Sequence, residues 1–280
     1  MDMIDPPTFN NPIHPDVAPY LDAEYAVFHN KHLADRPGIY KLPWNPTCRV
    51  GSANPGELDP CDVSSVRDLT IPGTPPVKVR VFVPPGEKPE GGWPALVYFH
   101  GGGWVLGNID SENSFCTRTC ITAKCIVISV DYRLAPEHVF PAAVDDCWTA
   151  IEWIYKHGSV ELAINSLNIA VGGSSAGGNL SAVMTQRAAQ RSPALPIKYQ
   201  VLIVPVTDNT VQEDGVAELD ILRSEGEAYA QKLKEAGKNV ELVVYKGAPH
   251  SVFMMDKAVT ISFRLGEDAA QALYKAFYSS

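Results

Sequence analysis

The stretch LNIAVGGSSAGGNLSAVMTQRAA, residues 167–189, decides the fold of this chain. Its apolar start is typical of a buried strand, its glycines predict a sharp turn, and the residues from 176 onward have helical spacing. A strand, a turn and a helix are the context in which a G-x-S-x-G motif carries chemical meaning. Only Ser175 has glycine two residues away on both sides, at Gly173 and Gly177, so the register favours Ser175 over Ser174.

The glycines around Ser175 have a physical reason. A strand-to-helix turn this sharp strains the serine backbone, and larger neighbours would collide with the strand and the helix. The hydroxyl then stands clear of the sheet, at the amino end of the new helix, which favours a developing negative charge. We interpret Ser175 as a nucleophile; a phosphate loop would need GxxxxGK[ST] or GxGxxG, and the turn has neither pattern.

Short apolar runs alternate with helical patterns on both sides of this turn. We expect strands in VRDLTI (66–71), VKVRVFV (77–83), ALVYF (95–99), CIVISV (125–130), LNIAV (167–171), YQVLIV (199–204) and VELVVY (240–245). We expect helices near 110–123, 142–156, 176–191 and 223–236, and a last one toward residue 278. This order predicts an α/β fold with a mainly parallel sheet, helices on both faces, and the two early strands as an antiparallel edge.

The first 60 residues differ from the rest of the chain. A helix is expected over 16–32, and Pro and Gly break the pattern at 37–60. We therefore divide the chain into an N-terminal lid segment, 1–60, and an α/β catalytic domain, 61–280.

Composition excludes several classes of function. With 23 basic and 32 acidic residues the net charge is −9, and no Lys or Arg run is present, so nucleic acid is not an expected partner. No apolar run is long enough for a membrane span, and the opening MDMIDPPTFN is unlike a signal peptide.

The six cysteines are irregularly spaced without a CxxC pair, which is typical of reduced thiols and of a cytoplasmic protein. Cys116 and Cys120 have helical spacing but no ligand partners, so we expect packing and no metal. Composition does not determine the oligomeric state.

A second glycine motif, HGGGW at 100–104, follows the apolar strand ALVYF. Adjacent glycines at a strand end expose backbone N–H groups that can stabilise an oxyanion, together with the amide of Ala176 after the nucleophile. We expect Gly102 and Gly103 to donate directly and Gly101 to support the turn. A merely flexible loop is the alternative. His100 precedes the nucleophile and is expected to hold the loop, not to act as a base.

The order Ser, acid, His expected for this type of fold selects the remaining candidates. Of seven histidines only His250 follows Ser175, in a loop after the run VELVVY. For the acid, Asp220 ends the run VAELD and fits best, while Asp208 is the rival. The two other nearby carboxylates, Glu225 and Glu227, look like charges in the first turn of a helix.

The motifs HGGGW, DYRLAPE (131–137), GGSSAGGN, DILRSEGEAY (220–229) and GAPH (247–250) together resemble the hormone-sensitive-lipase-like carboxylesterases. The resemblance covers the chain from Val77 onward, and the N-terminal helix is similar to the lid of that family. It implies the α/β-hydrolase fold, with a triad of Ser175, Asp220 and His250 that hydrolyses small to medium esters through an acyl-enzyme, with no metal or organic cofactor. The resembling plant gibberellin receptors lack the catalytic histidine, so a ligand-binding protein or an inactive pseudo-enzyme is the alternative.

Two departures from the family pattern stand out. Many members have Asp where this chain has Ser174. The interval from Ser175 to Asp220 is 220 − 175 = 45 residues, about half the usual span. Only TDNTVQEDG, 207–215, is left for a parallel crossover, which normally takes a dozen or more residues. We expect a lid helix, the crossover and the first half of the acid-bearing strand to be missing.

Overall fold

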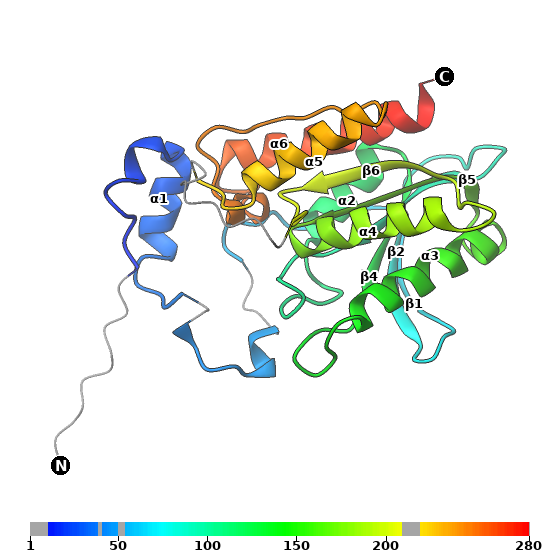
Figure 1. The fold of residues 1–280 in the computed structure, drawn as a ribbon, viewed down its shortest axis with the longest axis horizontal. Coiled ribbons are helices and arrows are strands. Elements are labelled where there is room, and N and C mark those ends of the chain that lie inside the picture. The colour runs from blue at the N-terminus through cyan, green and yellow to red at the C-terminus, as the bar shows by residue number, and fades with distance from the viewer. Residues whose placement is uncertain (1–10, 39–40, 50–53, 209–218, 280) are drawn as a thin grey trace, which may run out of the picture.

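The computed structural model describes residues 11–38, 41–49, 54–208 and 219–279, and its centre is a twisted sheet (Figure 1). The strands are β1 (Ser65–Ile71), β2 (Val77–Val83), β3 (Trp93–Phe99), β4 (Ile126–Asp131), β5 (Ile164–Ser174) and β6 (Ile197–Ile203). They lie in the order β1-β2-β4-β3-β5-β6. β1 and β2 run antiparallel, and β4, β3, β5 and β6 run parallel. The predicted mainly parallel sheet with an antiparallel edge is confirmed.

Helices cover both faces of the sheet. The helices of the described residues are α1 (Ala23–His32), α2 (Asn113–Thr122), α3 (Ala142–Glu161), α4 (Ala176–Gln190), α5 (Arg223–Glu235) and α6 (Thr260–Tyr278), with short 3₁₀ turns η1 (Ala18–Tyr20), η3 (Pro46–Arg49) and η4 (His250–Met254). α3 and α4 pack on one face, and α2 and α6 pack on the other. The α/β-hydrolase architecture expected from the sequence is therefore present.

The central strand β3 shows why its sequence is apolar throughout. All seven of its residues are buried. Val97 and Phe99 belong to the core under α3 and α4, whereas Leu96 and Tyr98 belong to the core under α2 and α6. Burying a large apolar side chain stabilises the fold by about 1.5–3 kcal/mol. Because β3 buries such side chains on both of its faces, it stabilises the packing of both helical layers.

The N-terminal helix begins later than predicted. The expected 16–32 helix is split into η1 and α1, because Leu21 has an extended backbone and Asp22 caps α1 with its carboxylate. Its Oδ1 accepts the N–H groups of Glu24 at 2.9 Å and Tyr25 at 3.0 Å. Tyr25 and Phe28 then pack with residues of η4 and the start of α6, so α1 lies against the loop that carries His250.

The prediction of a strand at 240–245 is wrong. These residues form no strand, and Leu242, Val243 and Val244 are each 41–50% exposed. A β-prone run becomes a strand only when a ladder partner satisfies its backbone. The sheet of the described residues ends at β6. Most of the expected partner run, VAELD, and most of the short crossover lie outside the described residues.

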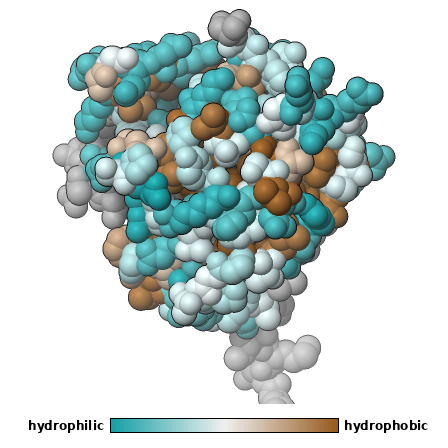
Figure 2. Space-filling model, turned by 90° about the vertical axis from the view of Figure 1, so that its right-hand side faces the viewer, coloured by the Kyte–Doolittle hydropathy of each residue, from teal (hydrophilic) through white to brown (hydrophobic). Residues whose placement is uncertain are grey.

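Figure 2 shows the end of the molecule that lies on the right of Figure 1, where the parallel strands begin. Apolar side chains on this face are interspersed with hydrophilic ones. Scattered exposed apolar residues are ordinary on a protein surface. The candidate functional residues gather at the opposite end, where the parallel strands finish.

Candidate active site

Ser175 lies between β5 and α4, in the turn that the glycine motif predicts. Its φ of +51° is in the region that residues other than glycine rarely adopt. A Cβ on Gly177 would collide with the backbone oxygens of Phe99 and His100, so this position requires glycine. The strained turn lifts the Ser175 side chain out of the sheet, as the nucleophile hypothesis requires.

Three side chains that are far apart in the sequence meet at this turn. His250 Nε2 lies 2.9 Å from Ser175 Oγ, and His250 Nδ1 lies 3.1 Å from both carboxylate oxygens of Asp220. Asp220 is buried, at 8% exposure. Its Oδ1 also accepts the N–H of Leu222 at 2.9 Å. The structure thus brings together the serine, imidazole and carboxylate proposed from the sequence, in the relay order that general-base activation of a hydroxyl needs.

The N-terminal segment fixes the loop that carries the imidazole. The N–H of Asp22, which caps α1, donates to the carbonyl of Gly247 at 2.9 Å. Gly247 has a φ of +82°, and a Cβ there would lie 2.9 Å from the nitrogen of Asp22, so the close approach depends on glycine. The α1 cap therefore holds the chain three residues before His250.

The other carboxylates considered for the triad have different positions. The carboxylate of Glu225 accepts the N–H groups of Thr207 at 2.7 Å and Asp208 at 3.3 Å. Glu227 accepts from Arg223 one turn earlier in α5. Glu225 is in the first turn of its helix, as expected, but it is buried and also holds the chain that leaves β6. Among the described residues, His250 Nδ1 makes its hydrogen bonds with Asp220.

The HGGGW loop presents free N–H groups beside the serine. Gly102 and Gly103 have φ values of +119° and +62°. Within the described part of the chain, the N–H groups of Gly102, Gly103 and Ala176 have no hydrogen-bond acceptor. The N–H of Gly101 instead donates to Glu112 at 3.1 Å. In this arrangement Gly102, Gly103 and Ala176 can donate to an oxyanion, whereas Gly101 supports the turn.

His100 is part of the scaffold of that loop. It is fully buried and stacks on Tyr132, with ring centroids 4.4 Å apart. Burial lowers the pKa of His100 to about 4, so the ring is neutral at pH 7. The Tyr132 hydroxyl donates to the His100 carbonyl at 2.7 Å. These contacts agree with a residue that holds the loop.

A cavity of about 240 Å³ opens beside the glycines. Its lining is mostly apolar and comprises Leu42, Pro43, Trp44, Cys48, Gly102, Gly103, Val105 and Leu106. Arg49 ties the N-terminal wall to the loop, because its guanidinium donates to the carbonyls of Val105 at 2.7 Å and Ala135 at 2.6 Å. The cavity is smaller than the roughly 300–1,000 Å³ typical of sites for drug-sized ligands.

Two residues of this site were not found from the sequence. Arg49 lies in the Pro-rich N-terminal stretch, where no motif marks it. Glu112 was counted within an expected helix, yet α2 begins one residue later and Glu112 has a φ of +60°. The roles of Arg49 and Glu112 depend on contacts with residues far along the chain. Neither local spacing nor a motif indicates such contacts.

The cysteines have the packing role expected of them. Cys116 and Cys120 are fully buried in the core between α2 and the sheet. Burial is the main cause that raises the pKa of both thiols, that of Cys120 to about 12. Among the residues the structure describes, no cluster of three or more His, Cys, Asp or Glu could hold a metal ion. No helix in the described ranges is long and apolar enough to cross a bilayer.

Comparison with known proteins places the chain in a family. A family model described as the alpha/beta hydrolase fold matches residues 96–215 and 215–254. An AB hydrolase superfamily protein of Schizosaccharomyces pombe is 37% identical over 95% of this chain and 97% of its own length. Esterase LipI of Mycobacterium tuberculosis is 43% identical over 51% of this chain, but the match covers only 44% of that esterase. The chain belongs to the hormone-sensitive-lipase-like carboxylesterases.

Solved structures of carboxylesterases support this assignment. The carboxylesterase EstE1, from a metagenomic library, superimposes with a TM-score of 0.70 at 30% identity, over 77% of this chain and 90% of its own. An ester hydrolase from the metagenome of Lake Arreo gives a TM-score of 0.77 at 29% identity, over 95% of this chain and 99% of its own. This carboxylesterase is therefore a serine hydrolase of the α/β-hydrolase type.

The same comparisons bear on the short interval before Asp220. The alignment with the Schizosaccharomyces pombe protein runs over 332 positions and this carboxylesterase has 280 residues, so at least 332 − 280 = 52 positions lack a counterpart here. The two matched parts of the family model meet at Gly215. Both observations agree with the expected shortening between β6 and Asp220.

Proposed function

We propose that this chain hydrolyses small to medium carboxylic esters through an acyl-enzyme on Ser175. The observation that supports it most is the continuous relay from Asp220 through His250 to Ser175, with contacts of 3.1 and 2.9 Å. In this mechanism His250 takes the Ser175 proton as Oγ attacks the ester carbonyl, and Asp220 orients and stabilises the imidazolium. The N–H groups of Gly102, Gly103 and Ala176 bind the oxyanion.

The proton on His250 then completes acylation, and attack by water completes the reaction. His250 gives its proton to the alcohol leaving group, and the acyl group stays on Ser175. His250 then takes a proton from water, which attacks the acyl carbonyl, and returns that proton to Ser175 as the acid leaves. Every proton in this scheme moves between the substrate, water and the two side chains, so the scheme needs neither a metal nor an organic cofactor.

The apolar cavity next to Gly102 and Gly103 suggests where one apolar end of the ester lies. Its volume, about 240 Å³, and its apolar lining support esters with a short aliphatic or small aromatic group. We further propose that residues 1–60 act as a lid segment on a catalytic domain of residues 61–280. The contacts of Arg49 and α1 with the glycine loop and the His250 loop support this division. The six cysteines are free, which supports a reducing location such as the cytoplasm.

Hydrolysis of p-nitrophenyl acetate and butyrate tests the proposal. Ser175→Ala should lower kcat at least about 10⁴-fold, because it removes the nucleophile. Ser166→Ala is a matched control, since Ser166 lies on β5, nine residues before Ser175, and its replacement should leave the rate unchanged. A fluorophosphonate probe should label the unaltered protein and not Ser175→Ala. Equal hydrolysis by the unaltered protein and Ser175→Ala, or an unreactive unaltered protein, would contradict the proposal.

A further inference from the structure

One buried carboxylate joins the two halves of the site that the proposed function uses. Glu112 is 4% exposed and lies in the chain between the HGGGW loop and α2. Its Oε1 accepts the Ser174 hydroxyl at 2.7 Å and the Gly101 N–H at 3.1 Å. Its Oε2 accepts the Tyr98 hydroxyl at 2.6 Å. Glu112 therefore contacts the residue before the nucleophile, the oxyanion loop and the end of β3 at the same time.

We propose that Glu112 is a positioning residue that sets the distance between the oxyanion donors and Ser175. Ser174 is covalently bonded to Ser175, and Gly101 to Gly102, so one carboxylate oxygen spans the two catalytic elements. The inference rests on the proposed function and adds a residue to it. Glu112 does not touch the substrate in this assignment; it acts through the two backbones that do.

Close packing at the junction makes that distance sensitive. A Cβ on Gly101 would lie only 2.6 Å from Ser174 Oγ and 3.2 Å from Glu112 Oε1. The loop therefore lies directly against the serine turn and the Glu112 carboxylate. An oxyanion donor works over a narrow range of about 2.7–3.1 Å, so a small displacement of Gly102 and Gly103 reduces its contribution.

A protein core would not retain this arrangement for packing alone. Burying a carboxylate costs free energy unless hydrogen bonds satisfy it, and burial raises the pKa of Glu112. Its φ of +60° adds strain that most side chains avoid. The three hydrogen bonds compensate for both costs, but they belong to no helix or ladder. They join elements whose relative position matters to the chemistry.

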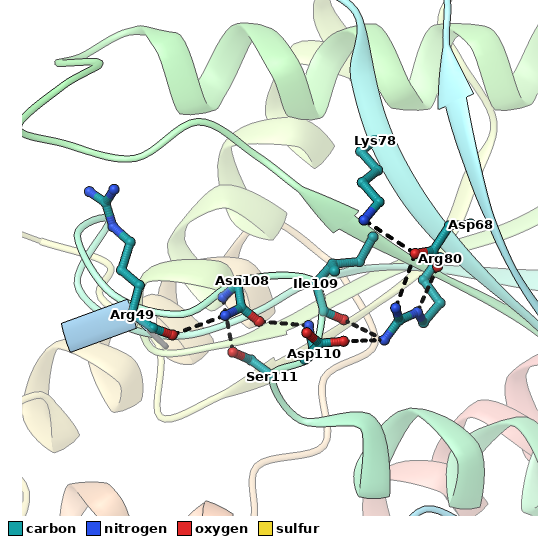
Figure 3. A network of polar contacts seen from close by, with 8 residues as sticks. All are labelled: Arg49, Asp68, Lys78, Arg80, Asn108, Ile109, Asp110 and Ser111. Carbon is teal, nitrogen blue, oxygen red and sulfur yellow. Dashed lines mark hydrogen bonds and ion pairs between the residues drawn. The ribbon is translucent and has the colours of Figure 1, made fainter. Parts of the chain in front are cut away.

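The backbone before Glu112 is anchored independently of its side chain. Figure 3 shows the turn at Asn108, Ile109, Asp110 and Ser111 held from two sides. The Asp110 carboxylate and the Ile109 carbonyl accept from the Arg80 guanidinium, which also pairs with Asp68 across β1 and β2. On the other side the Asn108 amide donates to the Arg49 carbonyl at 2.9 Å.

This anchoring has a consequence for mutants of Glu112. The turn should keep its place when the side chain is replaced, and only the links from the carboxylate to Gly101, Ser174 and Tyr98 should be lost. A change in activity would then report those links and not a collapse of the loop.

Two substitutions separate the hydrogen bonds from packing and charge. Glu112→Gln keeps an oxygen for Ser174 and Gly101, and its amide can donate to the Tyr98 oxygen. Glu112→Leu keeps similar bulk and loses all three links. We expect Glu112→Leu to lower kcat about 10²-fold, near the lower end for loss of an oxyanion donor, with KM changed less than about threefold. Glu112→Gln should stay within about threefold of the unaltered kcat.

The tests are steady-state hydrolysis of p-nitrophenyl butyrate and inhibition by a tetrahedral transition-state mimic, phenylboronic acid. The inhibition constant of phenylboronic acid should rise in parallel with the loss of kcat in Glu112→Leu and stay unchanged in Glu112→Gln. A kcat of Glu112→Leu within about threefold of the unaltered protein would overturn the proposal. So would an equal loss in both variants, which would show that the negative charge is what matters.

A further variant covers the case in which Glu112→Leu does not fold. Ser174→Ala removes one link only, and we expect kcat to fall about fivefold at constant KM. An unchanged kcat would overturn the proposal. Labelling of the unaltered protein by a fluorophosphonate keeps the two hypotheses apart: an unlabelled, inactive protein refutes the esterase function, while an active protein that tolerates these substitutions refutes only the role of Glu112.

Discussion

Replacement of Asp220 by Asn should trap His250 in the wrong tautomer. In the structure Asp220 Oδ1 accepts the N–H of Leu222 at 2.9 Å, and both carboxylate oxygens lie 3.1 Å from His250 Nδ1. A main-chain N–H can only donate. In Asp220→Asn the amide oxygen must therefore stay opposite Leu222, so the NH₂ group takes the Oδ2 position, which lies as close to His250 Nδ1 as Oδ1 does.

The tautomer decides the size of the effect. A ring proton on Nδ1 would face the new NH₂ group donor to donor, so we expect Nδ1 to accept from that amide and the ring proton to move to Nε2. Nε2 lies 2.9 Å from Ser175 Oγ, so a proton there prevents His250 from taking the serine proton. The corresponding change in serine proteases costs about 10⁴ in kcat, and each tenfold is 1.36 kcal/mol, so the barrier should rise by about 5 kcal/mol.

The assay is kcat for p-nitrophenyl butyrate at pH 7, with thermal unfolding to show that the variant folds. Asp208→Asn is the matched control, because Asp208 was the rival acid, and it should change kcat by less than about threefold. The reasoning would be refuted if Asp220→Asn kept more than about a tenth of the activity. It would also be refuted if Asp208→Asn lost as much as Asp220→Asn.

Three further predictions concern stability and reactivity. Burial, with help from neighbouring carboxylates, raises the pKa of Glu57 from 4.5 to about 7, so the folded state holds this proton more tightly than the unfolded chain. The stability contributed by that proton is present below pH 4.5 and is lost as the pH rises toward 7. Glu57→Gln cannot lose the proton, so its free energy of unfolding should fall by about 1–2 kcal/mol less than that of the unaltered protein between pH 5 and pH 8, after allowance for solvent screening. Urea unfolding at the two pH values measures this difference. A pH-independent difference between the two proteins would contradict it. Gly177→Ala should destabilise by about 2–3 kcal/mol or more, since its Cβ collides with the Phe99 carbonyl; an unchanged melting temperature would show that the turn can relax. A thiol reagent should modify the partly exposed Cys48 and Cys61 in the native state and all six cysteines only after unfolding; rapid native modification of the other four would contradict their burial.

Local sequence predicted most of the fold because the pattern and the structure depend on the same short-range chemistry. β3 and β5 are apolar runs bounded by glycine turns, and they form the strands expected of them. The 240–245 run has the same β-prone composition and is not a strand. A strand also needs a ladder partner, and none of the strands in the described residues pairs with this run. The composition of a segment indicates its preference for β structure, but whether the segment joins a sheet depends on the strands beside it.

The sequence by itself predicted the serine turn, the oxyanion glycines and the histidine. Ser175, Gly102 and Gly103 follow from backbone conformations that only certain residues adopt, and His250 follows from its place in the chain order. Only the tertiary structure decided which carboxylate faces His250 and showed that Glu112 joins Gly101 to Ser174. These contacts span 30 residues for His250 with Asp220 and 62 for Ser174 with Glu112. Such pairs form because the packed strands and helices bring them together, and no preference of neighbouring residues encodes them.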